Sequence, residues 1–194
     1  PVESERDAKS ISHEETYSSN KYENAELQRE LVRLADAVAS RLRAAGVGAR
    51  TLSLKLRFDS GFQTITRSVT CAEAVELAPE IVALLSPLLE AIDPSPGVRL
   101  LGVGGSNLGP SIRQLSLDDV GDDRADWPAA TEALDRIRDR FGAAAIGPAS
   151  ALESGKLQVI RRGGQQWGPD GEPIGARRAA RQGATPENDR LDPG

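Results

Sequence analysis

The stretch RTLSLKLRF at residues 50–58, followed after a short turn by FQTITRS at residues 62–68, is the most informative part of this chain. Successive side chains of a β-strand point to opposite faces. In the first stretch one face is apolar and consists of Leu52, Leu54, Leu56 and Phe58. The other face is polar and consists of Ser53, Lys55 and Arg57. The pattern predicts a β-hairpin with one buried face and one basic, hydroxyl-rich face.

The second stretch repeats this division. Ile65 and Val69 are predicted to point inward, and the side chains predicted to point outward are Thr64, Thr66 and Ser68. Their hydroxyl groups can donate hydrogen bonds to phosphate oxygens. Arg67 falls among the inward positions, so we expect a bulge or an edge strand there. A soluble hairpin whose solvent-facing side happens to be cationic would show the same pattern, and the hairpin alone does not separate the two interpretations.

The composition indicates one folded domain followed by a tail. Of the 194 residues 39% are hydrophobic, and the periodic apolar segments lie within residues 9–108. Residues 1–8 and 109–128 are predicted to be linkers. Residues 129–194 are rich in Gly, Pro, Ala, Asp and Arg, and are predicted to be mostly disordered. Within them the spacing of Leu134, Ile137 and Phe141 predicts one short helix at residues 129–141.

The charge differs between the whole chain and the hairpin. A net charge of −5 by itself argues against nucleic-acid binding. Residues 51–71, however, hold Lys55, Arg57 and Arg67 against Asp59 alone, so we expect a positive local field there.

Other counts exclude several classes of protein. One cysteine cannot form an internal disulfide, and with one histidine it cannot complete a structural zinc site. No apolar run is long enough to span a membrane and no signal peptide pattern is evident, so we expect a cytoplasmic protein. The first residue is Pro and not Met, which suggests a fragment or a processed piece.

The apolar spacing predicts secondary structure in the order β-α-β-β-α-β. A polar strand is predicted at residues 9–17, and a helix at residues 24–45 with Asn24 as its cap and Gly46 as its stop. After the hairpin, a second helix is predicted to start after Thr70, with Pro79 and Pro87 splitting or kinking it. A last strand follows at residues 98–108. We therefore predict an α+β fold: a four-stranded antiparallel sheet with two helices on one face and the opposite face open.

Three blocks in this order resemble the C-terminal little finger of Y-family DNA polymerases. They are KSIS with EETY at residues 9–12 and 14–17, the hairpin at residues 54–68, and VRLLGV at residues 98–103. The similarity is greatest to the bacterial lesion-bypass members of the family. Residues 133–152 resemble, more loosely, the C-terminal extensions of actinobacterial members.

The resemblance implies a DNA-binding module that has no catalytic centre. In the family the sheet lies against the major-groove side of primer-template DNA and holds phosphates of both strands. The DNA contacts implied at matching positions are Ser10, Lys55, Arg57, Thr66, Arg67, Ser68 and Arg99. The magnesium-binding carboxylates of the family lie in a palm domain upstream. The chain is therefore expected to hold no cofactor, to be monomeric and to lack polymerase activity alone.

The family commonly carries a sliding-clamp-binding peptide after the little finger. Residues 114–118 match four of its five positions and consist of Gln114, Leu115, Ser116, Leu117 and Asp118. The resemblance implies that the two leucines enter an apolar cleft of the bacterial clamp while the Gln114 amide fixes the register. Asp118 replaces the aromatic residue of the family, which predicts weak binding. A polar linker with two leucines remains an alternative, because short motifs often match by chance.

Other interpretations fit the sequence less well. An RNA-binding sheet of the same topology would present aromatic side chains for base stacking, whereas the outward positions here are Ser, Thr, Lys and Arg. A nucleotide-binding loop at residues 102–109 is disfavoured because Asn107 stands where the dinucleotide motif has its third glycine. Cys71 with His13 as nucleophile and base lacks an evident orienting group. Trp167 in the tail either docks on the domain or binds a partner.

Overall fold

The computed structural model describes residues 8–111, 127–142, 144–153 and 156–157. The chain divides into two compact units, residues 1–161 and 162–194, and the second lies entirely outside the described residues. The predicted clamp-binding peptide at residues 114–118, Trp167 and most of the predicted disordered tail also lie outside them. Among the described residues, none of the helices has the length and apolar character needed to cross a membrane.

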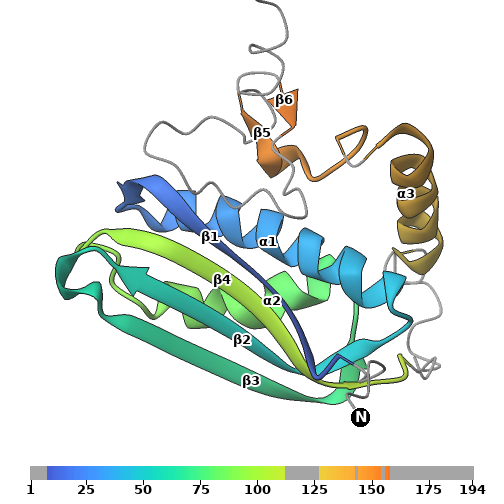
Figure 1. The fold of residues 1–194 in the computed structure, drawn as a ribbon, viewed down its shortest axis with the longest axis horizontal. Helices are drawn as coiled ribbons and strands as arrows, with labels where there is room; N and C mark the ends of the chain where they lie inside the picture. Colours follow the sequence, from blue (N-terminus) through green and yellow to red (C-terminus); the bar gives the residue numbers. More distant parts are fainter. Residues whose placement is uncertain (1–7, 112–126, 143, 154–155, 158–194) are drawn as a thin grey trace, which may run out of the picture. The chain divides into compact units, whose positions relative to one another are not determined.

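The domain has the predicted β-α-β-β-α-β order. Its elements are β1 (Ser10–Lys21), α1 (Asn24–Ala44), β2 (Gly48–Phe58), the short 3-10 helix η1 (Ser60–Phe62), β3 (Thr64–Val75), α2 (Ala78–Glu90) and β4 (Val98–Gly109). The four strands form one antiparallel sheet in the order β1-β4-β2-β3, with β1 and β3 at the edges (Figure 1). Helices α1 and α2 pack against each other and against one face of this sheet. The predicted fold is confirmed.

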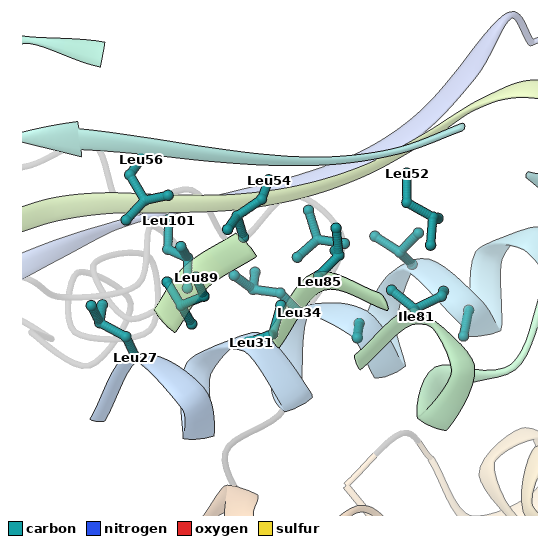
Figure 2. Packing of buried hydrophobic residues seen from close by; sticks show 14 of the residues in the cluster. Leu27, Leu31, Leu34, Leu52, Leu54, Leu56, Ile81, Leu85, Leu89 and Leu101 are labelled. Carbon is teal, nitrogen blue, oxygen red and sulfur yellow. The ribbon is translucent and has the colours of Figure 1, made fainter. Parts of the chain in front are cut away.

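The core lies between this sheet face and the two helices. Figure 2 shows that leucines of β2 and β4 pack against side chains from α1 and α2. The residues are Leu52, Leu54, Leu56 and Leu101 from the sheet, Leu27, Leu31 and Leu34 from α1, and Ile81, Leu85 and Leu89 from α2. Each of them is at most 1% exposed. Burying such a side chain contributes about 1.5–3 kcal/mol, so this layer fixes the orientation of the sheet. The period-two prediction of the buried hairpin face is correct.

Two helix starts differ from the prediction. Helix α1 is capped by Glu23 in an extended conformation, and Asn24 is already its first residue. Its predicted end is confirmed by Gly46, which has a φ of 65° that suits glycine. Helix α2 begins only at Ala78, because β3 continues and pairs Val75 with Ala49 of β2.

The two prolines of α2 also behave differently from the prediction. Pro79 lies in the first turn of α2, where its missing N–H costs no intrahelical hydrogen bond. Pro87 lies inside α2, and the helix continues past it to Glu90, so neither proline splits the helix.

A further helix, α3 (Trp127–Phe141), confirms the helix predicted after the domain. Two ion pairs join α3 to α1. The predicted apolar side of α3 is not fully buried, since Phe141 is 68% exposed. Arg43 of α1 donates to both carboxylate oxygens of Asp135 at 2.7 and 2.9 Å. Arg138 of α3 donates to both oxygens of Asp36 at 3.3 and 2.7 Å. After α3 come the 3-10 helix η4 (Ala149–Ala151) and the short paired strands β5 (Leu152–Glu153) and β6 (Lys156–Leu157).

Candidate nucleic-acid interface

The sheet face that points away from α1 and α2 carries four rows of four residues. Residues directly opposite each other in antiparallel strands lie on the same face, so the register defines these rows. Read in the order β1, β4, β2, β3, they are Thr16, Leu100, Arg57 and Thr64; Glu14, Gly102, Lys55 and Thr66; Ser12, Gly104, Ser53 and Ser68; and Ser10, Ser106, Thr51 and Thr70. We call these sixteen residues the open face. None of them is aromatic, and ten carry a hydroxyl group.

An ion pair lies near the middle of the open face. Lys55 Nζ lies 3.0 and 2.9 Å from the two carboxylate oxygens of Glu14. Glu14 is on β1 and Lys55 is on β2, and Gly102 of β4 lies between them in the same row. A Cβ atom at position 102 would lie 2.6 Å from Cγ of Glu14. The glycine therefore leaves the space in which the Glu14 side chain crosses β4.

Arg57 has no carboxylate partner among the described residues. Its Nε donates to Oγ1 of Thr64 at 3.2 Å, and the residue is exposed. Leu100, the neighbour of Arg57 in the same row, is only 8% exposed although it does not belong to the core cluster. Arg57 is thus exposed, is held by a neutral hydroxyl and has an apolar neighbour. Its positive charge is available to an anion from solution.

The hydroxyl groups flank the two charged residues. Thr66 and Ser68 on β3 are exposed and lie opposite Lys55 and Ser53. Gly104 separates Ser12 from Ser53, and a Cβ atom there would lie 2.8 Å from the Ser53 Oγ. Short hydroxyl side chains beside glycines allow a phosphate backbone to approach the sheet closely.

The remaining predicted contacts lie at the margins. Ser10 is exposed at the end of β1. Arg99 is the extra residue in a register shift, because Arg57 pairs with Leu100 and the next residue of β2 pairs with Val98. The guanidinium of Arg99 lies 3.8 Å from the Asp59 carboxylate.

Arg67 occupies the predicted edge strand, but its position there is not bulged, since the pairing is continuous from Thr64 to Thr70. Arg67 lies opposite the buried Leu54, on the parity of the helix-covered face, and donates to the backbone oxygen of Thr66 at 3.2 Å. It is therefore placed differently from Lys55 and Arg57.

Sequence reasoning missed Glu14 as a member of this surface. Its carboxylate lies against Lys55, so the open face is less positive than the hairpin alone predicts. The alternating pattern of β1 places Glu14 on the polar side. The strand order β1-β4-β2 brings Glu14 to Lys55, and the local spacing of residues does not predict this order.

The other candidate sites are not assembled. His13 and Cys71 lie on β1 and β3, the two opposite edges of the sheet, with two strands between them. Burial, with a contribution from Glu80, raises the pKa of the Cys71 thiol and so disfavours its thiolate. Residues 102–109 continue strand β4 and form no nucleotide-binding loop. In the part of the chain that is described, no three His, Cys, Asp or Glu side chains are grouped to hold a metal ion.

The open sheet with its helix layer belongs to the class of α+β little finger domains. The chain matches the model of the impB/mucB/samB family C-terminal domain over residues 8–117, more than half its length, and belongs to this family. It is 38% identical over 130 residues to DNA polymerase IV of Streptomyces coelicolor, and 33% identical over 156 residues to DNA polymerase IV of Brucella melitensis. These alignments cover 66% and 80% of this chain. The predicted resemblance to Y-family polymerases is thereby confirmed.

The alignments cover only 27% and 35% of those two relatives, so the chain spans about a third of their length. Among solved structures, the chain is similar to one described as a complex of the beta-clamp processivity factor and the little finger domain of PolIV. The TM-score is 0.45 with 23% identity, and the match covers 56% of this chain and 97% of that chain. A Y-family polymerase chimera, Dbh-Dpo4(243-245)-Dbh, is similar with a TM-score of 0.45 and 16% identity, covering 57% of this chain and 31% of that chain.

Proposed function

We propose that this chain is the part of an error-prone translesion DNA polymerase that holds primer-template DNA, and that it does so through the open face without reading the base sequence. The observation that carries this proposal is the composition of the open face: hydroxyl groups, two central glycines and the cations of Lys55 and Arg57, with no aromatic residue in the four rows. Hydroxyl and cationic groups are suited to phosphate oxygens, and contacts to phosphate carry no direct information about base identity.

Binding through the backbone explains why such a module suits lesion bypass. A surface that contacts phosphates is indifferent to chemical damage on the bases, because the damaged atoms are not among its contacts. The same surface disfavours an RNA-binding sheet, which stacks bases on aromatic side chains. Nucleotidyl transfer with magnesium is assigned to the remainder of the longer polymerase, in keeping with relatives of which this chain spans about a third.

A second part of the proposal concerns the sliding clamp. Residues 114–118 carry two leucines spaced to act as buried anchors, directly after a domain that holds DNA. Weak contacts to the clamp and to DNA reinforce each other when one chain makes both, because each contact raises the effective concentration of the other partner.

The experiment that tests DNA binding compares two double variants of the full chain. Lys55→Ala with Arg57→Ala removes both cations of the open face, and Arg29→Ala with Arg136→Ala removes two exposed cations from α1 and α3. Fluorescence anisotropy with labelled primer-template DNA is recorded between 50 and 200 mM salt.

Each lost phosphate contact flattens the slope of log affinity against log salt by about one unit, so we expect a loss of roughly two units in the first variant alone. The loss should be the same for DNA of different sequences. Equal affinities of the two double variants would contradict the proposed function.

A further inference from the structure

We propose that Glu14 is a built-in competitor of the DNA phosphate at Lys55, and that it lowers the DNA affinity of the open face. This inference rests on the proposed function and adds to it a residue that sets affinity. The sign of its effect is opposite to that of the predicted contact residues.

The first argument is that the pair is specifically accommodated. Strands β1 and β2 are not neighbours, and two strand spacings of about 4.8 Å separate them. Glu14 bridges this gap over Gly102, where a side chain would lie 2.6 Å from its Cγ. Both carboxylate oxygens then lie about 3 Å from the ammonium nitrogen of Lys55.

The second argument is chemical. A carboxylate and a phosphate both present anionic oxygens to the N–H groups of an ammonium, so they compete for the same donors. The Lys55 and Glu14 side chains are 33% and 36% exposed, so the pair is open to an approaching ligand. Glu14 contacts Lys55 through two oxygens, so a phosphate at Lys55 either displaces Glu14 or shares the ammonium with it, and in both cases it meets a negative charge close to the DNA.

The third argument is a comparison within the same face. Arg57 is held by the neutral hydroxyl of Thr64, which a phosphate displaces without leaving a like charge behind. The competition is therefore confined to the row of Glu14, Gly102 and Lys55.

The test is the isosteric variant Glu14→Gln, which removes the charge and keeps the shape. We expect about five- to tenfold tighter binding of primer-template DNA at 50 mM salt. In the native protein, a displaced Glu14 takes up a cation from solution and so offsets part of the counterion release. Glu14→Gln has no such offset, so its slope of log affinity against log salt should be steeper by up to about one unit. The matched control is Glu23→Gln, which makes the same charge change at an exposed position before α1.

The same substitution in a Lys55→Ala background separates competition from general repulsion. Competition for Lys55 predicts that the gain falls below about twofold when the lysine is absent. A gain of the same size without Lys55, or an equal gain from Glu23→Gln, would overturn the inference.

The two proposals fail in different ways. DNA binding that Glu14→Gln leaves unchanged, while Lys55→Ala with Arg57→Ala still weakens it, overturns this inference alone. DNA binding that is insensitive to the open-face cations overturns the proposed function and this inference with it.

Discussion

Leu54 and Lys55 are neighbours in the chain but lie on opposite faces of the sheet. Leu54 is completely buried against α1 and α2, whereas the Lys55 side chain is 33% exposed and lies against Glu14. Each strand of the domain thus contributes alternately to stability and to the open face, and the two properties can be changed separately.

This separation predicts different effects for two adjacent substitutions. Leu54→Ala removes a buried leucine and leaves a cavity, so the free energy of unfolding should fall by about 2–5 kcal/mol. Lys55→Ala, the matched control, breaks only a partly exposed ion pair and should cost less than about 1 kcal/mol. Urea unfolding followed by circular dichroism measures both. A similar loss in both variants would show that the two faces are not distinct.

His13 predicts a specific dependence of stability on pH. Burial lowers its pKa from 6.5, and Arg41 and Arg33 act in the same direction while Glu15 opposes them. The folded state therefore favours neutral His13, and its contribution is complete above pH 6.5 and is lost as the pH falls through the lower pKa of the folded state.

The measurement is the free energy of unfolding at several values between pH 8 and 5. His13 is the one histidine of the chain, so comparison with His13→Asn isolates its effect from that of the carboxylates. The native protein should lose more stability than the variant over this range. Parallel curves would contradict the partly buried, neutral state of His13.

The two ion pairs predict how α3 is held on α1. Arg138→Ala removes the arginine that pairs with Asp36, and Asp135→Ala removes the carboxylate that pairs with Arg43, which keeps only its hydrogen bond to the backbone oxygen of Glu76. Because these side chains are partly buried, each pair should contribute about 1–2 kcal/mol, between the values for exposed and buried pairs.

Amide hydrogen exchange in residues 127–141 should therefore become about tenfold faster in either variant, with little change in β2 and β4. Arg136→Ala is the matched control, since Arg136 is on the same helix with 73% of its side chain exposed. Unchanged exchange in all three variants would show that other contacts hold α3.

The clamp proposal predicts opposite effects for substitutions within residues 114–118. Leu115→Ala with Leu117→Ala should abolish association with the bacterial sliding clamp and leave DNA binding intact. Asp118→Phe should strengthen association, because it supplies the aromatic group that the family motif has there. Calorimetry with purified clamp distinguishes these outcomes, and equal binding by all forms would remove the peptide from the account.

The parts of this structure that depend on local alternation could be predicted from the sequence. Period-two spacing placed Leu52, Leu54 and Leu56 inward and Lys55 and Arg57 outward, because successive side chains of any strand alternate. The predicted start of α2 is wrong because strand pairing, and not local spacing, decides where this helix begins. Its apolar spacing could be extended back toward Ala74, but pairing of Val75 with Ala49 keeps that segment in β3.

Contacts between distant segments could not be predicted. β4 is the last of the four strands along the chain, but it lies between β1 and β2 in the sheet. Glu14 contacts Lys55 because β4 has a glycine where the Glu14 side chain crosses it. Asp36 and Arg138 are 102 residues apart, and neither position is unusual in the local sequence. Both contacts depend on the tertiary structure, which the residue pattern of a single segment does not predict.

The central claim is that the open face is the surface that meets DNA, and nuclear magnetic resonance titration of the full chain with short primer-template DNA tests it most directly. The account predicts that the largest amide shifts lie on β2 and β3 at Ser53, Lys55, Arg57, Thr66 and Ser68, while α1 and α2 change little. Shifts confined to the helices, with these five amides unmoved at saturating DNA, would contradict it.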